Sequence, residues 1–285
     1  MGEWMFEGGV CLITGATSGI GKATAISLAQ QGMVVTIVSR KREKGELVSQ
    51  EIARRTGNSN LELFVADLSS ISEVRRLARE VREKHPTVDI LINNAGGIFG
   101  TRTLTRDGIE LTFALNHLSY FLLTNLLLEP LKSSRHGRVV NVSSQAHQFG
   151  SMDFDDPGQA EKYNAMRAYA QSKLANILFT YELARRLRVT NVTANALHPG
   201  TVRSKFGREL PGIGGFFFRN FGMFMRSPEK AAETVTWLAL ARELASVSGR
   251  YFVDKKEIHS SKISYDAEAA QRLWELSEGM TGLTP

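Results

Sequence analysis

The chain is poor in cysteine, has no long apolar run and shows no strong excess of one charge. Its single cysteine, Cys11, has no partner for an internal disulfide, which excludes a disulfide-stabilised secreted scaffold and fits a reducing compartment. Because Cys11 lies in an apolar stretch, we expect a small core residue rather than a reactive thiol. With 42% hydrophobic and 22% charged residues among 285, the composition is that of a globular protein.

Targeting signals are also missing. The first nine residues carry Glu3 and Glu7 and no apolar segment, so we expect neither a signal peptide nor an N-terminal membrane anchor. No later apolar run is long enough to cross a bilayer. We therefore expect a cytoplasmic protein without a transmembrane segment.

The charged residues and the histidines give no sign of nucleic acid or of a metal. The net charge of +6 comes from 35 Lys and Arg against 29 Asp and Glu, with bases and acids intermixed as on solvated helix faces. The densest basic cluster, residues 40–44, is short and suits a small phosphate better than a nucleic-acid track. The six histidines are dispersed without metal-ligand spacing, so we expect no metal site.

A glycine-rich stretch near the start, Thr14 to Gly21, reads Thr-Gly-Ala-Thr-Ser-Gly-Ile-Gly. An apolar run before it predicts a strand, and the pattern after it predicts a helix. Gly15, Gly19 and Gly21 would bring backbone N–H groups close to a pyrophosphate, which the positive end of the helix dipole also attracts. The spacing differs from Gly-x-Gly-x-x-Gly, and a tight strand-to-helix turn without a ligand stays an alternative.

Strand and helix patterns alternate along the rest of the chain. Apolar, β-branched runs predict seven strands, near residues 10–13, 33–38, 61–65, 88–92, 138–142, 192–197 and 251–253. Helical patterns follow at 43–56, 70–84, 105–128, 167–187 and 227–241. With right-handed crossovers, this alternation predicts a single α/β domain over 1–285: a Rossmann-type doubly wound parallel sheet of about seven strands, with its ligand at the carboxyl ends of the strands.

Two polar residues on the helix predicted at 167–187, Tyr169 and Lys173, are four apart and share one helix face. A free tyrosine has a pKa of about 10, and a nearby ammonium would favour the phenolate and bring the group toward proton transfer at neutral pH. Tyr-x-x-x-Lys also occurs by chance on exposed helices. The context decides between these two interpretations.

These motifs occur together in the order of one known family. The sequence resembles short-chain dehydrogenases/reductases in Thr14–Gly21, Asp67, Asn93-Asn-Ala-Gly96, Asn116, Ser144, Tyr169, Lys173 and His198-Pro-Gly200. It is more closely similar to the retinol dehydrogenase-like branch in residues 138–147 and 172–180 and around 273–277. The resemblance extends over residues 8–279 and implies an oxidoreductase.

The resemblance implies four catalytic residues. Tyr169 would be the general acid/base, and Lys173 would lower its pKa and bind the nicotinamide ribose. Ser144 would hold the substrate oxygen, with Ser143 the less suitable hydroxyl, and Asn116 would anchor a water molecule of a proton relay.

The resemblance and the glycine turn together imply contacts with NADP(H) from Gly15, Thr17, Ser18, Gly19, Ile20, Gly21, Arg40, Asp67, Leu68, Asn94, Ala95, Gly96, Tyr169, Lys173, Pro199, Gly200 and Val202. The family comparison puts Asp67 at the adenine edge and Asn93 and Gly96 near the adenosine side. Residues 93–97 could also simply end a strand, and His198 could be a turn residue.

The end of the second predicted strand bears on the choice of cofactor. An NAD site needs an acid there, whereas this chain has Ser39 and Arg40. Arg40, with Lys22, could bind the 2′-phosphate of NADP(H) through charge-assisted hydrogen bonds, and the branch prefers NADP(H). The alternative is that Arg40 is one more solvated base.

We therefore expect an NADP(H)-dependent oxidoreductase that interconverts a carbonyl and an alcohol on a small hydrophobic substrate, mainly by reduction. Retinoid-like aldehydes, long-chain aldehydes and apolar ketones all fit, and the sequence does not choose among them. The alternative is an NADP(H)-binding sensor or interaction protein with little catalytic activity, against which the four intact catalytic residues argue.

Residues 201–226 are a candidate substrate lid. Within them, 211–226 contain four glycines, five phenylalanines and two methionines, which predict a movable, apolar surface; ordinary core residues are the alternative. Residues 213–225 are also a candidate for peripheral membrane contact. The predicted helices at 105–128 and 167–187 are candidates for a homodimer contact.

Overall fold

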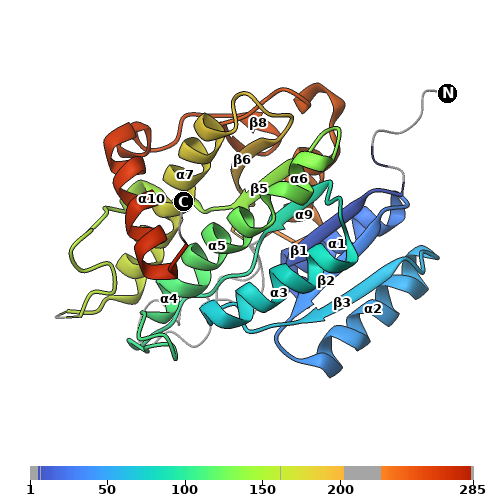
Figure 1. Cartoon of the computed structure of the whole chain (residues 1–285), viewed down its shortest axis with the longest axis horizontal. Helices are drawn as coiled ribbons and strands as arrows, with labels where there is room; N and C mark the ends of the chain where they lie inside the picture. The colour runs from blue at the N-terminus through green and yellow to red at the C-terminus, as the bar shows by residue number, and fades with distance from the viewer. Residues whose placement is uncertain (1–5, 7, 161, 202–225, 284–285) are drawn as a thin grey trace.

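A single eight-stranded sheet runs through the structure, a computed structural model that describes residues 6, 8–160, 162–201 and 226–283 (Figure 1). Its strand order is β3-β2-β1-β4-β5-β6-β7-β8. The strands are β1 (Val10–Thr14), β2 (Val34–Ser39), β3 (Leu61–Val65), β4 (Ile90–Asn93), β5 (Arg138–Val142), β6 (Thr193–His198), β7 (Tyr251–Val253) and β8 (Lys256–Glu257). The predicted doubly wound α/β fold is confirmed, and the seven predicted strands occur at their expected places.

The eighth strand was not predicted, because its sequence carries no strand pattern. β8 consists of two exposed charged residues and pairs antiparallel with β7. The turn between the two strands, Asp254 and Lys255, has φ angles of 52° and 60°, as a two-residue hairpin turn requires. The hairpin therefore rests on turn geometry that hydrophobic periodicity does not reveal.

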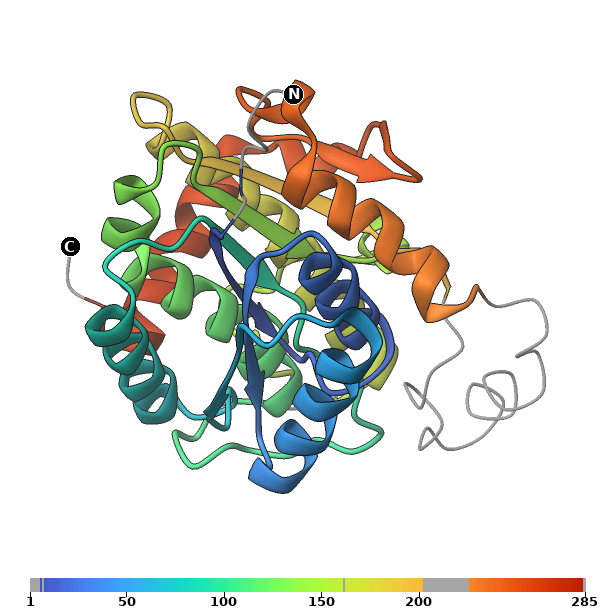
Figure 2. The same ribbon diagram turned by 90° about the vertical axis from the view of Figure 1, so that its right-hand side faces the viewer.

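Helices cover both faces of the sheet (Figure 2). One face carries α1 (Gly19–Gln30), α2 (Arg42–Thr56) and α9 (Pro228–Leu240), and the other carries α3 (Ile71–Lys84), α5 (Ser119–Leu126), α7 (Ala165–Arg186) and α10 (Ala267–Thr281). Successive residues of β1 alternate between the two apolar cores: Cys11 and Ile13 belong to one, and Leu12 belongs to the other. Cys11 is fully buried, and burial raises the pKa of its thiol.

The long helix predicted at 105–128 is wrong in its first part. Leu104 and Glu110 form an antiparallel bridge, and helix α4 (Leu111–Phe113) begins only after it. The Glu110 carboxylate accepts hydrogen bonds from the backbone N–H groups of Thr112 (2.8 Å) and Phe113 (2.9 Å), so it caps the helix at that point.

A π-helical turn, η1 (Ala114–Leu118), follows and leads into α5. The Ser119 N–H donates to the carbonyl of Ala114, five residues back. Such wide turns inside α-helices are frequent at functional sites, and this one contains Asn116. The chain then continues into α6 (Leu128–Ser133).

Helix α10 packs across α5 and α7 through Trp274, which is 5% exposed. The indole ring centroid lies 5.0 Å from that of Phe121 and 5.8 Å from that of Phe179. Arg75 of α3 donates to the carbonyls of Thr281 (3.0 Å) and Gly282 (2.7 Å) and so holds the end of the helix. Part of the face proposed for a homodimer is therefore covered by the chain itself.

Trp274→Ala should lower the free energy of unfolding by about 3 to 5 kcal/mol, because a buried aromatic side chain is lost and its cavity cannot fully collapse. Leu47→Ala is the control: Leu47 lies on α2 and is 66% exposed, so its removal should change stability by less than about 0.5 kcal/mol. Urea unfolding of both variants measures the difference. Equal losses would contradict this packing of α10.

Candidate active site

The predicted site residues gather where the strand order changes direction. β1 and β4 are neighbours, with β2 and β3 on one side and β5 to β7 on the other. In doubly wound sheets, ligands bind at the carboxyl ends of the strands beside such a switch point. Gly15 follows β1, Asn94 follows β4, Ser144 follows β5 and Pro199 follows β6, so all four lie along this edge.

The glycine turn is locked to the end of β4. The Asn94 side-chain amide donates to the carbonyls of Thr14 (2.8 Å) and Gly15 (3.2 Å). Thr14 Oγ1 accepts hydrogen bonds from the backbone N–H groups of Asn94 (2.9 Å) and Ala95 (3.0 Å). A Cβ atom on Gly21 would lie 2.4 Å from the Gly15 carbonyl oxygen, so the close approach requires glycine there.

This turn fits a pyrophosphate. Gly15 and Gly19 have φ angles of 66° and 52°, which only glycine adopts readily. Ser18 stands at the N-cap of α1 without a capping hydrogen bond from its side chain. The first N–H groups of a helix lack intrahelical partners, and those of α1, next to Thr17 and Ile20, therefore suit an anionic group.

At the expected adenosine end, Asp67 Oδ1 accepts hydrogen bonds from the N–H (3.0 Å) and the hydroxyl (2.7 Å) of Ser69. Leu68 beside it is buried. Asn93 differs from the expectation, because its side chain is fully buried and donates to Asn141 (2.8 Å) and Thr124 (2.9 Å) inside the protein.

Gly96 also differs from the adenosine-side expectation. A Cβ atom at this position would lie 3.1 Å from Asn116 Oδ1 and 3.6 Å from Lys173 Nζ. Gly96, just after β4, therefore lies next to the candidate catalytic residues Asn116 and Lys173.

The two bases considered for a 2′-phosphate have different surroundings. Arg40 is exposed directly after β2. Lys22 forms an ion pair with Glu51 of α2, with Nζ 2.9 Å from Oε1. Arg40 is therefore the better placed of the two for an added anion.

The four candidate catalytic residues come from three segments, α7, η1 and the end of β5. Lys173 is 4% exposed, and its Nζ donates to the Val142 carbonyl of β5 (3.0 Å). The same Nζ lies 5.7 Å from the ring centroid of Tyr169. Tyr169 is half-buried and hydrogen-bonded to Ser144, so the structure brings these three side chains together.

Asn116 is held rigidly at η1. Its Oδ1 accepts from the Gly97 N–H (2.8 Å), and its Nδ2 donates to the Gly97 carbonyl (2.9 Å) and to Ser172 Oγ (3.0 Å). Both N–H donors of the Asn116 amide are therefore used within the protein, and its Oδ1 accepts one hydrogen bond.

The pKa values differ from the expectation of a permanent cation that lowers the tyrosine pKa. Burial raises the pKa of Tyr169 to about 12, and the hydrogen bond with Ser144 only partly opposes this rise. Burial also lowers the pKa of Lys173 to about 7. In the protein alone, desolvation thus dominates both pKa values, and Tyr169 is protonated at neutral pH.

Ser143 and Ser144 have separate roles in the structure. Ser143 Oγ donates to the Lys173 carbonyl (2.7 Å) and is buried. Ser144 is half-buried, and its Oγ accepts from the Ala146 N–H (3.2 Å). Ser144 therefore keeps a hydroxyl proton to donate, which agrees with the choice of Ser144 over Ser143.

The loop after β6 contains the remaining predicted contacts. Pro199 is buried, Gly200 has a φ angle of 89°, and His198 Nδ1 accepts from the Gln145 N–H (3.2 Å). Residues 202–225 lie outside the described residues. They include Val202, most of the candidate lid and all of the candidate membrane segment.

Sequence reasoning missed two neighbours of the catalytic residues. The ring centroid of Tyr120 lies 5.7 Å from Lys173 Nζ, and Ser172 supports Asn116. Helical spacing could have indicated both, since Tyr120 is four residues after Asn116 and Ser172 is three residues after Tyr169.

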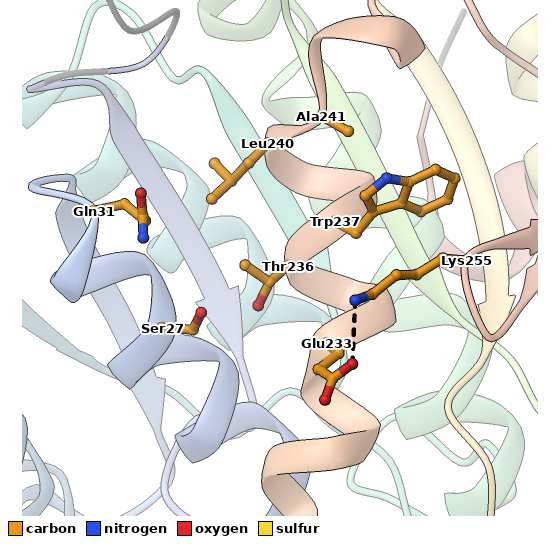
Figure 3. A pocket seen from close by; sticks show the side chains of 8 residues that line it. All are labelled: Ser27, Gln31, Glu233, Thr236, Trp237, Leu240, Ala241 and Lys255. Atoms are coloured by element: carbon orange, nitrogen blue, oxygen red, sulfur yellow. Dashed lines mark hydrogen bonds and ion pairs between the residues drawn. The ribbon is translucent and has the colours of Figure 1, made fainter.

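A groove of about 350 Å³ lies away from these residues, between α1 and α9 (Figure 3). Its lining comprises Ser27, Gln31, Glu233, Thr236, Trp237, Leu240, Ala241 and Lys255. None of these was predicted to contact cofactor or substrate. Within the described ranges, no group of three or more His, Cys, Asp or Glu could hold a metal ion, and no helix is long and apolar enough to cross a membrane.

Two buried histidines should make the protein less stable in mild acid. Burial lowers the pKa values of His117 and His198 to about 4, whereas an unfolded histidine titrates near 6.5. Between these values the unfolded chain binds more protons, so stability falls as the pH drops from about 6.5 toward 4, by at most roughly 3 kcal/mol per histidine.

Urea unfolding between pH 7.5 and 5 measures this effect. Carboxylates with lowered pKa values, such as Glu182, titrate below 4.5 and contribute little in this range. His198→Asn, whose amide can still accept from Gln145, should flatten the pH dependence. A stability independent of pH in the wild type would show that these rings are not buried and neutral.

Comparison with known proteins agrees with the site. The family model for short chain dehydrogenase matches residues 9–211. Retinol dehydrogenase 13 of Homo sapiens is 45% identical over 283 residues, which cover 97% of this chain and 85% of that protein. Retinol dehydrogenase 14 of Mus musculus is 41% identical, with 98% of this chain and 87% of that protein covered.

The crystal structure of an uncharacterised protein from Mycobacterium paratuberculosis superposes with a TM-score of 0.78 at 33% identity, over 98% of this chain and 95% of that one. The family uses nicotinamide cofactors to interconvert alcohols and carbonyls. The chain therefore belongs to the short-chain dehydrogenase/reductase family, in its retinol dehydrogenase-like branch.

Proposed function

We propose that the whole chain, residues 1–285, is one NADP(H)-binding catalytic domain that interconverts a carbonyl and an alcohol on a hydrophobic substrate. The observation that carries this proposal is the meeting of Tyr169, Lys173 and Ser144 next to Asn116 at the carboxyl edge of the sheet, beside the turn that fits a pyrophosphate. The cofactor and the proton donor would then lie side by side at the carboxyl edge of the sheet.

The bound nicotinamide would supply the hydride in reduction and accept it in oxidation. In reduction, Tyr169 donates its phenolic proton to the substrate oxygen, and a pKa of about 12 keeps this proton in place at neutral pH. Ser144 Oγ donates a hydrogen bond to the same oxygen and aligns it with the phenol. The protonated form of Tyr169 is the one that reduction requires.

Lys173 and Asn116 support this proton transfer. Lys173 Nζ, beside the Tyr169 ring, would contact the nicotinamide ribose, and its protonated form would stabilise the phenolate that remains after donation. Asn116 would anchor the relay water, and its side chain is held in place by Gly97 and Ser172.

Arg40 would select NADPH over NADH by binding the 2′-phosphate, which only NADPH carries. The end of β2 has Ser39 and Arg40 in place of the acid that would bind the ribose of NADH. Arg40→Ala should raise the Kd for NADPH by roughly 10- to 100-fold, as expected for lost hydrogen bonds to a charged group, and should leave the Kd for NADH nearly unchanged. Fluorescence titration measures both constants.

Arg42→Ala is the matched control for Arg40. Arg42 is exposed on α2, and its Nη1 lies 3.7 Å from Glu46 Oε1. Its removal should change the Kd of neither cofactor. Wild-type affinities that are equal for NADPH and NADH, and unchanged by Arg40→Ala, would refute a role of Arg40 in selecting the cofactor.

The substrate class we propose is a retinoid-like aldehyde, another long-chain aldehyde or an apolar ketone. Two observations support it: the names of the retinol dehydrogenase relatives and the aromatic composition of residues 211–226. The candidate lid, the peripheral membrane contact through 213–225 and the cytoplasmic location remain predictions. A homodimer through α5 and α7 would have to include α10, since Trp274 covers Phe121 and Phe179.

A panel of carbonyl compounds tests the proposed function. Retinoid aldehydes, long-chain aldehydes and apolar ketones would be incubated with purified protein and NADPH, with short polar carbonyls as controls. We expect NADPH consumption with the apolar members and much less with the polar ones. NADPH binding without consumption of the cofactor on any member would contradict an enzyme and favour a sensor.

A further inference from the structure

His147 is a buried histidine in the turn that follows Ser144, within η2 (Gln145–Phe149). Its ring nitrogens contact two different segments. Nδ1 lies 2.7 Å from the Ser144 carbonyl oxygen, and Nε2 lies 3.0 Å from the backbone nitrogen of Ser261. The ring therefore connects the backbone of a candidate catalytic residue to a segment 114 residues away.

The partners determine where the ring carries its proton. A carbonyl oxygen can only accept, so Nδ1 carries the hydrogen and donates to Ser144. A backbone N–H can only donate, so Nε2 is bare and accepts from Ser261. The neutral Nδ1–H tautomer satisfies both contacts. In a doubly protonated ring, the N–H at Nε2 would face the N–H of Ser261, and neither could accept a hydrogen bond.

The groups around the ring agree with a neutral imidazole. Tyr251 of β7 packs against it with ring centroids 5.0 Å apart. His198, at the end of β6, is also close enough to interact electrostatically with His147. Burial lowers the pKa of His147, with the contact to Ser144 opposing the change. These surroundings keep the ring neutral near pH 7.

The far side of this connection is itself fixed. Ser264 Oγ donates to the Ser261 carbonyl (2.6 Å) and also hydrogen-bonds Ser260 Oγ (2.6 Å), which in turn contacts Tyr181 of α7 (2.7 Å). Ser261 therefore belongs to a hydrogen-bonded segment docked on the same helix that carries Tyr169. The His147 ring, bound to Ser144 on one side and to Ser261 on the other, therefore fixes the distance between Ser144 and the segment around Ser261.

We propose that His147 is a positioning residue for Ser144. Its Nδ1–H donates to the Ser144 carbonyl and so orients the serine whose hydroxyl donates a hydrogen bond to the substrate oxygen. Its unprotonated Nε2 accepts from the Ser261 N–H and so anchors this turn to the segment around Ser261. The inference rests on the proposed function of Ser144. His147 acts through the backbone and contacts neither substrate nor cofactor in this role.

Two amide variants separate the two ring nitrogens. In His147→Asn the side-chain amide can reach the place of Nδ1 and still donate to Ser144, but it loses Ser261. In His147→Gln the amide can reach the place of Nε2 and accept from Ser261, but the side-chain hydrogen bond to the Ser144 carbonyl is lost, and only the backbone N–H of residue 147 (3.1 Å) still donates to it. Each variant removes one hydrogen bond and some ring volume, so a purely structural role predicts similar losses of stability and activity.

A positioning role predicts different kinetics for the two variants. His147→Gln should lower kcat by roughly 10- to 100-fold, the size expected when a reacting group is displaced by about 1 Å, while Kd for NADPH stays at the wild-type value. His147→Asn should keep most of the wild-type kcat. Equal kcat values in both variants, or a lower one in His147→Asn, would overturn the proposal.

Ser261→Ala is the control for the far contact. It keeps the backbone N–H that His147 uses, and the buried Ser261 hydroxyl has no hydrogen-bond partner among the residues that the structure describes. Its kcat should equal that of the wild type. A loss comparable to that of His147→Gln would show that the segment around Ser261, rather than the Ser144 contact, controls the rate, and would overturn the proposal.

The tautomer can be measured independently of catalysis. ¹⁵N NMR of histidine-labelled wild type, with the His147→Gln spectrum for assignment, should show a protonated Nδ1 and a bare Nε2 for His147. A protonated Nε2 would overturn the proposal even in an active enzyme. If the wild type reduces no carbonyl compound, the proposed function fails and the positioning role fails with it, whereas an active wild type with an active His147→Gln variant refutes the positioning role alone.

Discussion

Tyr169→Phe should lower kcat by roughly 10²- to 10⁴-fold, the usual contribution of a general acid/base. The variant loses the only proton that Tyr169 can donate, while its ring still packs beside Lys173. Binding of NADPH and the unfolding temperature should stay close to wild type. Steady-state kinetics with the best substrate of the carbonyl panel, together with an NADPH titration, measure these quantities.

The matched control is Tyr163→Phe. Tyr163 lies just before the same helix, is also half-buried and donates through its hydroxyl to the Phe99 carbonyl (2.8 Å), and it is neither a candidate catalytic residue nor a predicted cofactor contact. Its loss should leave kcat nearly unchanged. A folded Tyr169→Phe protein with wild-type turnover would remove Tyr169 from the mechanism.

Gly21→Ala should weaken NADPH binding by roughly 100-fold or more. The added methyl group would lie 2.4 Å from the Gly15 carbonyl oxygen and 2.5 Å from Asn94 Nδ2, and a backbone oxygen cannot move aside as a flexible side chain can. The turn would have to open, and the N–H groups aimed at the pyrophosphate would be displaced. Losing two hydrogen bonds to a charged group accounts for an effect of this size.

Gly279→Ala serves as the control for Gly21→Ala. Gly279 lies in α10, where an added Cβ would meet no other atom of the described residues within 4 Å, apart from its chain neighbours and the backbone of its own helix. Alanine there should leave NADPH binding unchanged and stabilise the helix by up to about 1 kcal/mol. NADPH affinity of Gly21→Ala equal to that of Gly279→Ala would show that the turn does not bind the cofactor.

The sequence was sufficient for the framework of the sheet. Buried parallel strands are rich in apolar, β-branched residues, as in Val34–Ser39 and Arg138–Val142, and strands of this kind need helical crossovers. The glycine turn follows from a short motif between a predicted strand and a predicted helix. The four catalytic residues came from the resemblance to short-chain dehydrogenases/reductases, and only the shared helix face of Tyr169 and Lys173 followed from their spacing.

The features that were missed are of two kinds. The Glu110 cap and the β7–β8 hairpin are local side-chain and turn geometry that hydrophobic periodicity does not show. The ion pair of Lys22 with Glu51 joins residues that are 29 apart in the sequence. Burial is likewise a property of the folded structure. The pKa values of Tyr169 and Lys173 therefore moved in directions that the four-residue spacing alone could not indicate.

The most direct test of the account is transfer of a labelled hydride. NADPH carrying deuterium at nicotinamide C4, on the face that the enzyme uses, would be mixed with the protein and a long-chain or retinoid aldehyde, and the alcohol product analysed by mass spectrometry. We predict one deuterium on the carbinol carbon with the wild type and almost no product with Tyr169→Phe. An alcohol without deuterium when either face of the nicotinamide is labelled, or no alcohol from any member of the panel, would contradict the proposal that this chain is an NADP(H)-dependent carbonyl reductase.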